Sequence, residues 1–153
     1  REEILADIEL QNPDNFDELV FCGYGEPTCR LHDMLWVCRE VRKRWNILIR
    51  LNTNGHASLF YGEDTAPLFA GLFDVISISL NAADAQSYDE VCHSIYGEDA
   101  YYGVLRFARD VKKYVQTVIL SVVEGTLGPD DIKKCAKMAD ELGVKLRVRT
   151  YIE

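Results

Sequence analysis

A glycine-rich segment, Gly23-Tyr24-Gly25-Glu26-Pro27, places exposed main chain beside a carboxylate directly after an apolar run. Gly23 and Gly25 lack side chains, so a ligand can approach the backbone there. Pro27 fixes a turn and removes one amide donor. What remains is rich in acceptors, namely the carbonyl groups around Tyr24 and Gly25 and the carboxylate of Glu26. Because a phosphate requires N–H donors, this segment suits a bound ammonium group better than a phosphate.

Further polar side chains follow the later predicted strands of the chain. They are Asn52 and Asn54, Ser79 and Asn81, Glu124, and Arg149 with Tyr151. Since ligands of parallel sheets bind beyond the carboxyl ends of the strands, we expect these groups and the glycine segment to form one site. Plainer interpretations also exist, such as an ordinary turn at Asn54, main-chain pairing for Ser79 and a solvent-facing carboxylate at Glu124.

Alternating strand and helix patterns position these groups. Strands are predicted over residues 18–22, 47–52, 75–80, 116–123 and 145–152, the first of them an apolar run covered on both faces. Helices are predicted over residues 1–10, 31–45, 67–70, 85–92, 101–114 and 129–142. Asp84 is predicted as one N-cap, and the last helix has Pro129 at its start and Gly143 past its end. This order predicts a parallel sheet with right-handed crossovers, either an open doubly wound sheet or part of a barrel.

Composition restricts the class of protein. The 153 residues, 48% of them hydrophobic, indicate one globular domain over residues 1–153 with a substantial core. A net charge of -8 argues against a nucleic-acid-binding surface, which needs a basic patch. No signal peptide is recognisable and no apolar run approaches the ~18 residues of a membrane span. We therefore expect a soluble, cytoplasmic protein that contacts neither nucleic acid nor membrane directly.

The spacing Gly23-x-Gly25-x-x-Thr28 comes near the glycine fingerprint of dinucleotide-binding proteins but departs from it. Thr28 stands where the third glycine belongs, and Pro27 interrupts the expected helix start. Asn52 ends the second strand, where an acid that binds the ribose is expected. The sequence therefore argues against a nicotinamide cofactor.

At the same residues the chain resembles the radical S-adenosylmethionine superfamily, in which a Gly-Gly-Glu-Pro type motif holds the ammonium group of the cofactor. Gly25, Glu26 and Pro27 match that motif, and Tyr24 replaces a glycine. The likeness covers nearly the whole chain, since it continues at Asn52-Thr53-Asn54-Gly55, Ser77-Ile78-Ser79-Leu80-Asn81 and Leu146-Arg147-Val148-Arg149-Thr150-Tyr151. It is closest to the subgroup associated with TatD-type nucleases.

The resemblance implies an α/β fold, a parallel-sheet partial (βα)6 TIM-like barrel of which this chain supplies about five βα units. It also implies that the strand ends bind S-adenosylmethionine. In that assignment Glu26 and nearby carbonyls bind the ammonium group, and Asn52, Asn54 or Ser79 binds the carboxylate. Ser79, Asn81 and Glu124 bind the ribose. The backbone from Arg149 to Tyr151 binds the adenine.

The activity implied is radical chemistry. In such enzymes an electron donor reduces a [4Fe-4S] cluster, and the cluster passes the electron to S-adenosylmethionine. The products are methionine and a 5′-deoxyadenosyl radical, which abstracts hydrogen from a substrate. The sequence does not identify that substrate or a catalytic residue.

The cysteines depart from this superfamily, whose cluster loop has the spacing C-x3-C-x2-C. The chain has no such spacing, nor a disulfide framework, among Cys22, Cys29, Cys38, Cys92 and Cys135. We expect reduced thiols that pack as small apolar groups, and no metal site. The economical explanation is a fragment whose first strand and cluster loop lie upstream, and which cannot cleave S-adenosylmethionine alone.

Loss of a first strand would leave residues 18–22 as an exposed apolar edge. We predict that further protein or another chain covers this edge, through self-association in the simplest case. Two other readings stay open: a protein without a cluster that binds S-adenosylmethionine or another nucleotide as a sensor or partner, and a structural α/β module that binds nothing.

Overall fold

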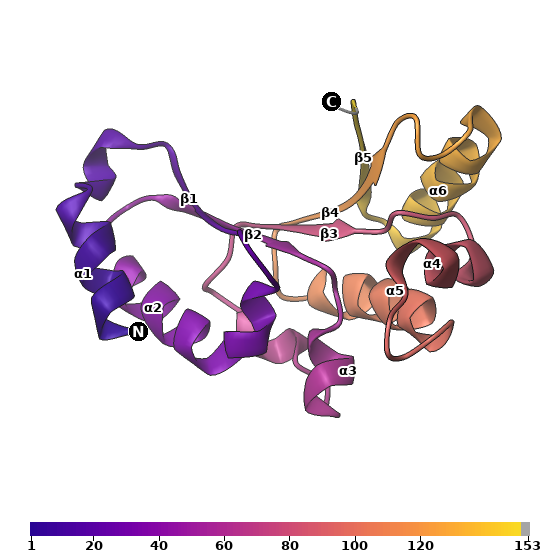
Figure 1. Ribbon diagram of the computed structural model, residues 1–153. Coiled ribbons are helices and arrows are strands. Elements are labelled where there is room, and N and C mark those ends of the chain that lie inside the picture. The colour runs from indigo at the N-terminus through magenta and orange to yellow at the C-terminus, as the bar shows by residue number, and fades with distance from the viewer. Residues whose placement is uncertain (151–153) are drawn as a thin grey trace.

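Figure 1 shows the computed structural model, which describes residues 1–150. The strands are β1 (Glu18–Phe21), β2 (Leu48–Thr53), β3 (Val75–Ser79), β4 (Thr117–Val123) and β5 (Lys145–Arg149). The helices are α1 (Glu2–Leu10), α2 (Leu31–Arg44), α3 (Ala57–Tyr61), α4 (Ala85–Cys92), α5 (Asp99–Val111) and α6 (Pro129–Leu142). Short 3-10 turns are η1 (Pro13–Asn15), η2 (Pro27–Arg30) and η3 (Ala66–Phe69).

All strands predicted from the sequence are present, although residues 151 and 152 of the last one lie outside the described residues. The segment predicted as a short helix over 67–70 is the 3-10 turn η3. Helix α3 was not predicted, because its single turn and a half is too short to show a helical period.

The sheet is entirely parallel, and its order is β1-β2-β3-β4-β5, so each strand lies beside the next strand in the chain. A doubly wound sheet would reverse its strand order at a switch point. The described strands contain no such reversal. Of the two architectures that the sequence left open, the doubly wound sheet is therefore excluded for residues 1–150.

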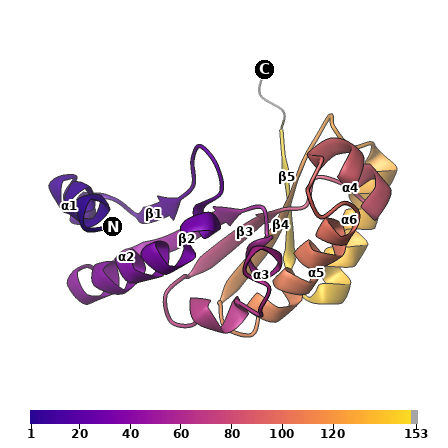
Figure 2. The same ribbon diagram turned by 60° about the horizontal axis from the view of Figure 1, so that its bottom comes forward.

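The helices lie on one side of the sheet, with α1 beside the β1 edge (Figures 1 and 2). On the three central strands the side chains that face the helices are buried, among them Ile49, Leu51, Ile76, Ile78 and Leu120. Within residues 1–150, no helix lies over the opposite side, which we call the open face (Figures 1 and 2). By strand alternation and register it carries Arg50, Asn52, Ser77, Ser79, Ile119, Ser121, Lys145, Arg147 and Arg149.

Strand β1 differs in one respect from its prediction. The apolar run was expected to be covered on both faces, yet β1 is half-buried at most and Cys22 is exposed. The reason is its position, since β1 is an edge strand beside an open face and β2 is its only neighbour among the described strands. Among the described strands β1 is thus at the edge of the sheet, and its coverage by further protein or another chain stays a prediction.

Helix ends follow the predicted signals. The carboxylate of Asp84 accepts the Ser87 N–H at 2.8 Å and caps α4. Helix α6 begins at Pro129 and is followed by Gly143, whose φ of +69° is left-handed. None of the described helices combines the length and the apolar character needed to cross a membrane.

Two cysteines contribute to the core as predicted. Cys38 and Cys135 are fully buried, and desolvation raises the pKa of Cys38 to about 12 and that of Cys135 to about 11. Both therefore remain neutral thiols and pack as small apolar groups. Cys22 and Cys29 are exposed, and no disulfide joins cysteines within residues 1–150.

Candidate functional site

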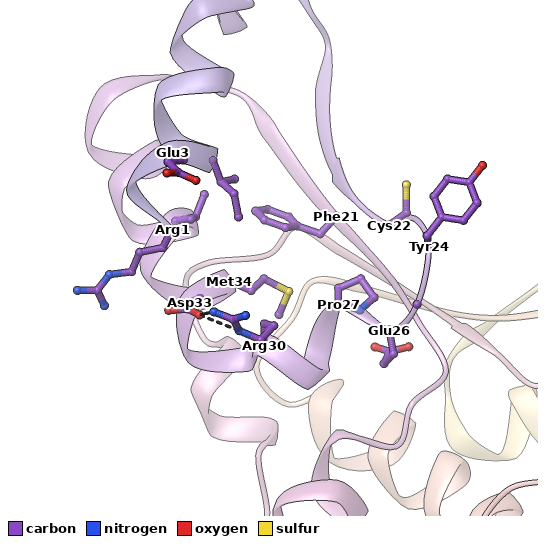
Figure 3. A pocket seen from close by; sticks show the side chains of 13 residues that line it. Arg1, Glu3, Phe21, Cys22, Tyr24, Glu26, Pro27, Arg30, Asp33 and Met34 are labelled. Carbon is purple, nitrogen blue, oxygen red and sulfur yellow. Dashed lines mark hydrogen bonds and ion pairs between the residues drawn. The ribbon is translucent and has the colours of Figure 1, made fainter.

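The glycine loop, residues 23–27, leaves β1 with an exposed main chain. Gly23 has φ of +133° and Gly25 has φ of +92°, values that side chains other than hydrogen rarely allow. A Cβ atom at either position would have no neighbour within 4 Å, so the backbone is open to a ligand. Figure 3 shows the side chains of Cys22 and Tyr24 on one side of the loop and that of Glu26 on the other.

The carboxylate of Glu26 is engaged by protein donors. Its Oε1 accepts the Thr28 N–H at 3.1 Å, the Thr28 hydroxyl at 2.7 Å and the Thr53 hydroxyl at 2.6 Å. Its Oε2 accepts the N–H of Asn54 at 2.8 Å. Glu26 thus cross-links the loop after β1 to the end of β2.

This cross-link changes what the loop can offer a cation. A carboxylate that already accepts four hydrogen bonds has little capacity left for an ammonium group. The carbonyl groups from Gly23 to Gly25 accept no hydrogen bond from any residue between 1 and 150. Within the loop, these carbonyl oxygens are the acceptors best placed for an ammonium ligand.

The two asparagines predicted at the end of β2 lie differently. Asn52 is exposed on the open face. Asn54 is half-buried, and its Oδ1 accepts the His56 N–H at 2.9 Å, which closes the turn. Thr53 points to the helix side, where its hydroxyl also accepts the N–H of Gly55 at 3.1 Å. Asn52 therefore keeps its whole amide for a ligand, and Asn54 keeps only its NH2 group.

Ser79 and Asn81 at the end of β3 are both half-buried. Ser79 lies on the open face opposite Ser121 of β4, and its hydroxyl makes no hydrogen bond with a described residue. Asn81 has φ of +64°, and its amide lies 3.7 Å from the sulfur of Cys92. Both residues lie at the end of β3, beside the end of β2 that carries Asn52.

The last predicted site residues lie at the ends of β4 and β5. Glu124 and Arg149 are exposed, and they meet through the main chain, because the Glu124 N–H donates to the Arg149 carbonyl at 2.7 Å. This bond extends the pairing of β4 and β5. Tyr151 lies outside the described residues.

A cavity of about 470 Å³ borders the glycine loop on the side of α1 and α2 (Figure 3). Its lining includes Gly25, Glu26, Pro27, Phe21 and Met34. That volume falls within the range of small-molecule sites. The cavity lies on the helix side, so the glycine loop separates it from the polar side chains of the open face.

A second cluster, which sequence analysis missed, lies on the helix side below Glu26. The Nε2 of His56 lies 2.8 Å from the hydroxyl of Tyr88, and its ring stacks edge-on against Tyr96. Burial lowers the pKa of His56, although the negative charge of Glu26 acts in the opposite direction. Burial also raises the pKa of Tyr88. Both shifts favour the neutral forms, so a neutral imidazole and a neutral phenol share this hydrogen bond.

This cluster predicts a pH-dependent stability. Because the pKa of His56 is lower in the folded state, the unfolded chain binds more protons near pH 6.5. The free energy of unfolding should therefore be smaller at pH 6.0 than at pH 7.5 in urea denaturation. The substitution His56→Asn should remove this difference. His32→Asn, at an exposed position, should retain it, and loss of the difference in that control instead would contradict the assignment.

No group of three or more His, Cys, Asp or Glu side chains within residues 1–150 could hold a metal ion. The cysteines are dispersed, and the described residues therefore do not fit an iron-sulfur cluster. Comparison with models of protein families gave no match, and comparison with curated proteins gave none either.

Proposed function

We propose that the carboxyl ends of the strands bind S-adenosylmethionine, with the glycine loop as the anchor. The observation that carries this proposal is the open main chain at Gly23 and Gly25, at the same end of the sheet as Asn52 and Ser79. The free carbonyls of the loop would accept hydrogen bonds from the ammonium group. The amide of Asn52 and the hydroxyl of Ser79 would donate to the carboxylate or the ribose.

The arrangement of layers supports a partial barrel as the parent fold. Parallel sheets are normally covered on both faces. A sheet of sequential order with all helices on one side leaves its other face for the interior of a barrel, as in (βα)8 enzymes. The polar side chains of the open face would then line that interior.

The wider proposal is that this domain belongs to a radical S-adenosylmethionine enzyme. When bound, a [4Fe-4S] cluster would supply the electron that cleaves the cofactor. Because residues 1–150 do not fit a cluster, its ligands would come from other protein. The role of the described residues is to bind and orient the nucleoside. The absence of a metal-binding group among them favours a second candidate function, a module that binds S-adenosylmethionine without a cluster.

Calorimetric titration of the iron-free protein with S-adenosylmethionine tests the binding. We expect saturable binding of one ligand per chain. Methylthioadenosine, which lacks the amino-acid portion, should bind at least about ten-fold more weakly, since it forfeits the charge-assisted bonds to the loop. Equal affinities would contradict an ammonium site, and no heat for either ligand would favour the structural module.

A further inference from the structure

Strand β5 presents a row of positive charge on the open face. Lys145, Arg147 and Arg149 alternate along the strand and are exposed. Between them, Leu146 packs against the core on the helix side. Alternate residues of a strand lie ~6.6 Å apart on one face, so the three cations span ~13 Å. We call these three residues the cationic row.

The cationic row differs from most other basic residues of this acidic chain. Arg42 pairs with Asp74, and Arg50 on the same open face pairs with Glu18. Most remaining lysines and arginines pair with carboxylates on neighbouring helical turns. Neither Lys145 nor Arg147 makes an ion pair with a residue between 1 and 150. Their charge is therefore available to an external anion, in a protein whose net charge is -8.

Hydroxyl groups adjoin the cationic row. Ser121 of β4 lies opposite Arg147, and Ser79 lies opposite Ser121 on the next strand. Ser121 is only 3% exposed, and its hydroxyl has no hydrogen-bond partner between residues 1 and 150. Since no fully buried side-chain oxygen among the described residues lacks a partner, this hydroxyl must reach the surface of the open face. Arg147 beside the hydroxyl of Ser121 offers convergent donors, as recognition of a carboxylate or phosphate requires.

We propose that the cationic row, with Arg147 and Ser121 at its centre, binds an anionic group of a small-molecule substrate, a phosphate or a carboxylate. This inference rests on the proposed function, because the other end of that substrate would react at the S-adenosylmethionine site. Strands are ~4.8 Å apart, so β5 lies ~10 Å from β3. A substrate anchored at Arg147 can reach the S-adenosylmethionine assigned to Ser79 and the glycine loop.

A small molecule fits the open face better than a single-stranded nucleic acid. Nucleic acids of that kind bind to aromatic side chains on which the bases stack. The open face carries no aromatic side chain along its described strands. The short length of the cationic row also matches one or two anionic groups and not a long polyanion.

The test uses inorganic pyrophosphate and citrate as probes, each titrated into the whole chain at low ionic strength and followed by amide chemical shifts in NMR. We expect saturable binding of at least one probe, with the largest shifts in β5 and at Ser121. Arg147→Gln should weaken that binding about ten-fold, because an arginine forms bidentate charged bonds with such groups. Arg39→Gln, at an exposed position on α2, is the matched control and should bind the probe as the native chain does.

The outcomes separate this inference from the proposed function. Binding of pyrophosphate alone indicates a phosphorylated substrate, and binding of citrate alone indicates a carboxylated one. If neither probe saturates, or if Arg147→Gln and Arg39→Gln bind equally well, the inference is overturned. The affinity of Arg147→Gln for S-adenosylmethionine should stay within about two-fold of the native value, since β5 lies ~10 Å from β3.

Discussion

Replacing Glu26 by glutamine should lower the free energy of unfolding by about 2 kcal/mol and weaken binding of S-adenosylmethionine at least about ten-fold. An amide has one acceptor oxygen in place of two, so it cannot serve Asn54 and both threonine hydroxyls together. At least one donor would lose its partner and the glycine loop its fixed position. Urea denaturation and calorimetry measure the two effects.

The matched control for Glu26→Gln is Glu63→Gln, which removes the same charge at an exposed position. Its stability should change by less than about 0.5 kcal/mol and its cofactor affinity should not change. If Glu26→Gln were as stable as the control, the cross-link between β1 and β2 would have no energetic importance. If it were less stable but bound the cofactor normally, the glycine loop would not be the anchor.

Replacing Gly55 by alanine should lower the free energy of unfolding by about 3 kcal/mol. Gly55 has φ of +79°, and its added Cβ would lie 2.8 Å from the Cγ2 of buried Ile78. The substitution therefore adds overpacking to backbone strain, at the turn that follows β2. Denaturation followed by circular dichroism measures the loss.

Gly62→Ala separates these two contributions. Gly62 has a similar φ of +69°, but an added Cβ would have no neighbour within 4 Å. Gly62→Ala should lower the free energy of unfolding by about 1 kcal/mol, from backbone strain alone. If Gly55→Ala and Gly62→Ala lowered the free energy of unfolding equally, the packing around Ile78 would adjust freely to the added methyl group. That result would contradict the close packing of the core.

Much of the fold could be predicted from the sequence because local signals agree with the tertiary structure. Apolar runs, alternation and β-branched residues located the strands, and Asp84, Pro129 and Gly143 marked helix ends. The order of the strands could not be predicted, since identical crossovers serve doubly wound sheets and barrels. Edge position likewise depends on neighbours, and for this reason the apolar run of β1 was wrongly expected to be covered on both faces.

The position of the candidate residues at the strand ends could be predicted from the sequence, but the hydrogen bonds of their side chains could not. The glycine loop, Asn52 and Ser79 do lie at one end of the sheet. The hydrogen bonds of Glu26 depend on the register between β1 and β2, which brings Thr53 and Asn54 to its carboxylate. The pairing of His56 with Tyr88 joins residues of separate elements and has no local signal. Spacing along the chain therefore could not distinguish a structural acid from a ligand-binding one.

The most direct test of the central claim is an NMR titration of the assigned, iron-free protein with S-adenosylmethionine. The account predicts that the largest amide shifts occur at Gly23, Gly25, Asn52 and Ser79, and that they saturate together with one affinity. Shifts confined to the helix side of the sheet, or no shifts at the glycine loop at a saturating concentration, would contradict it.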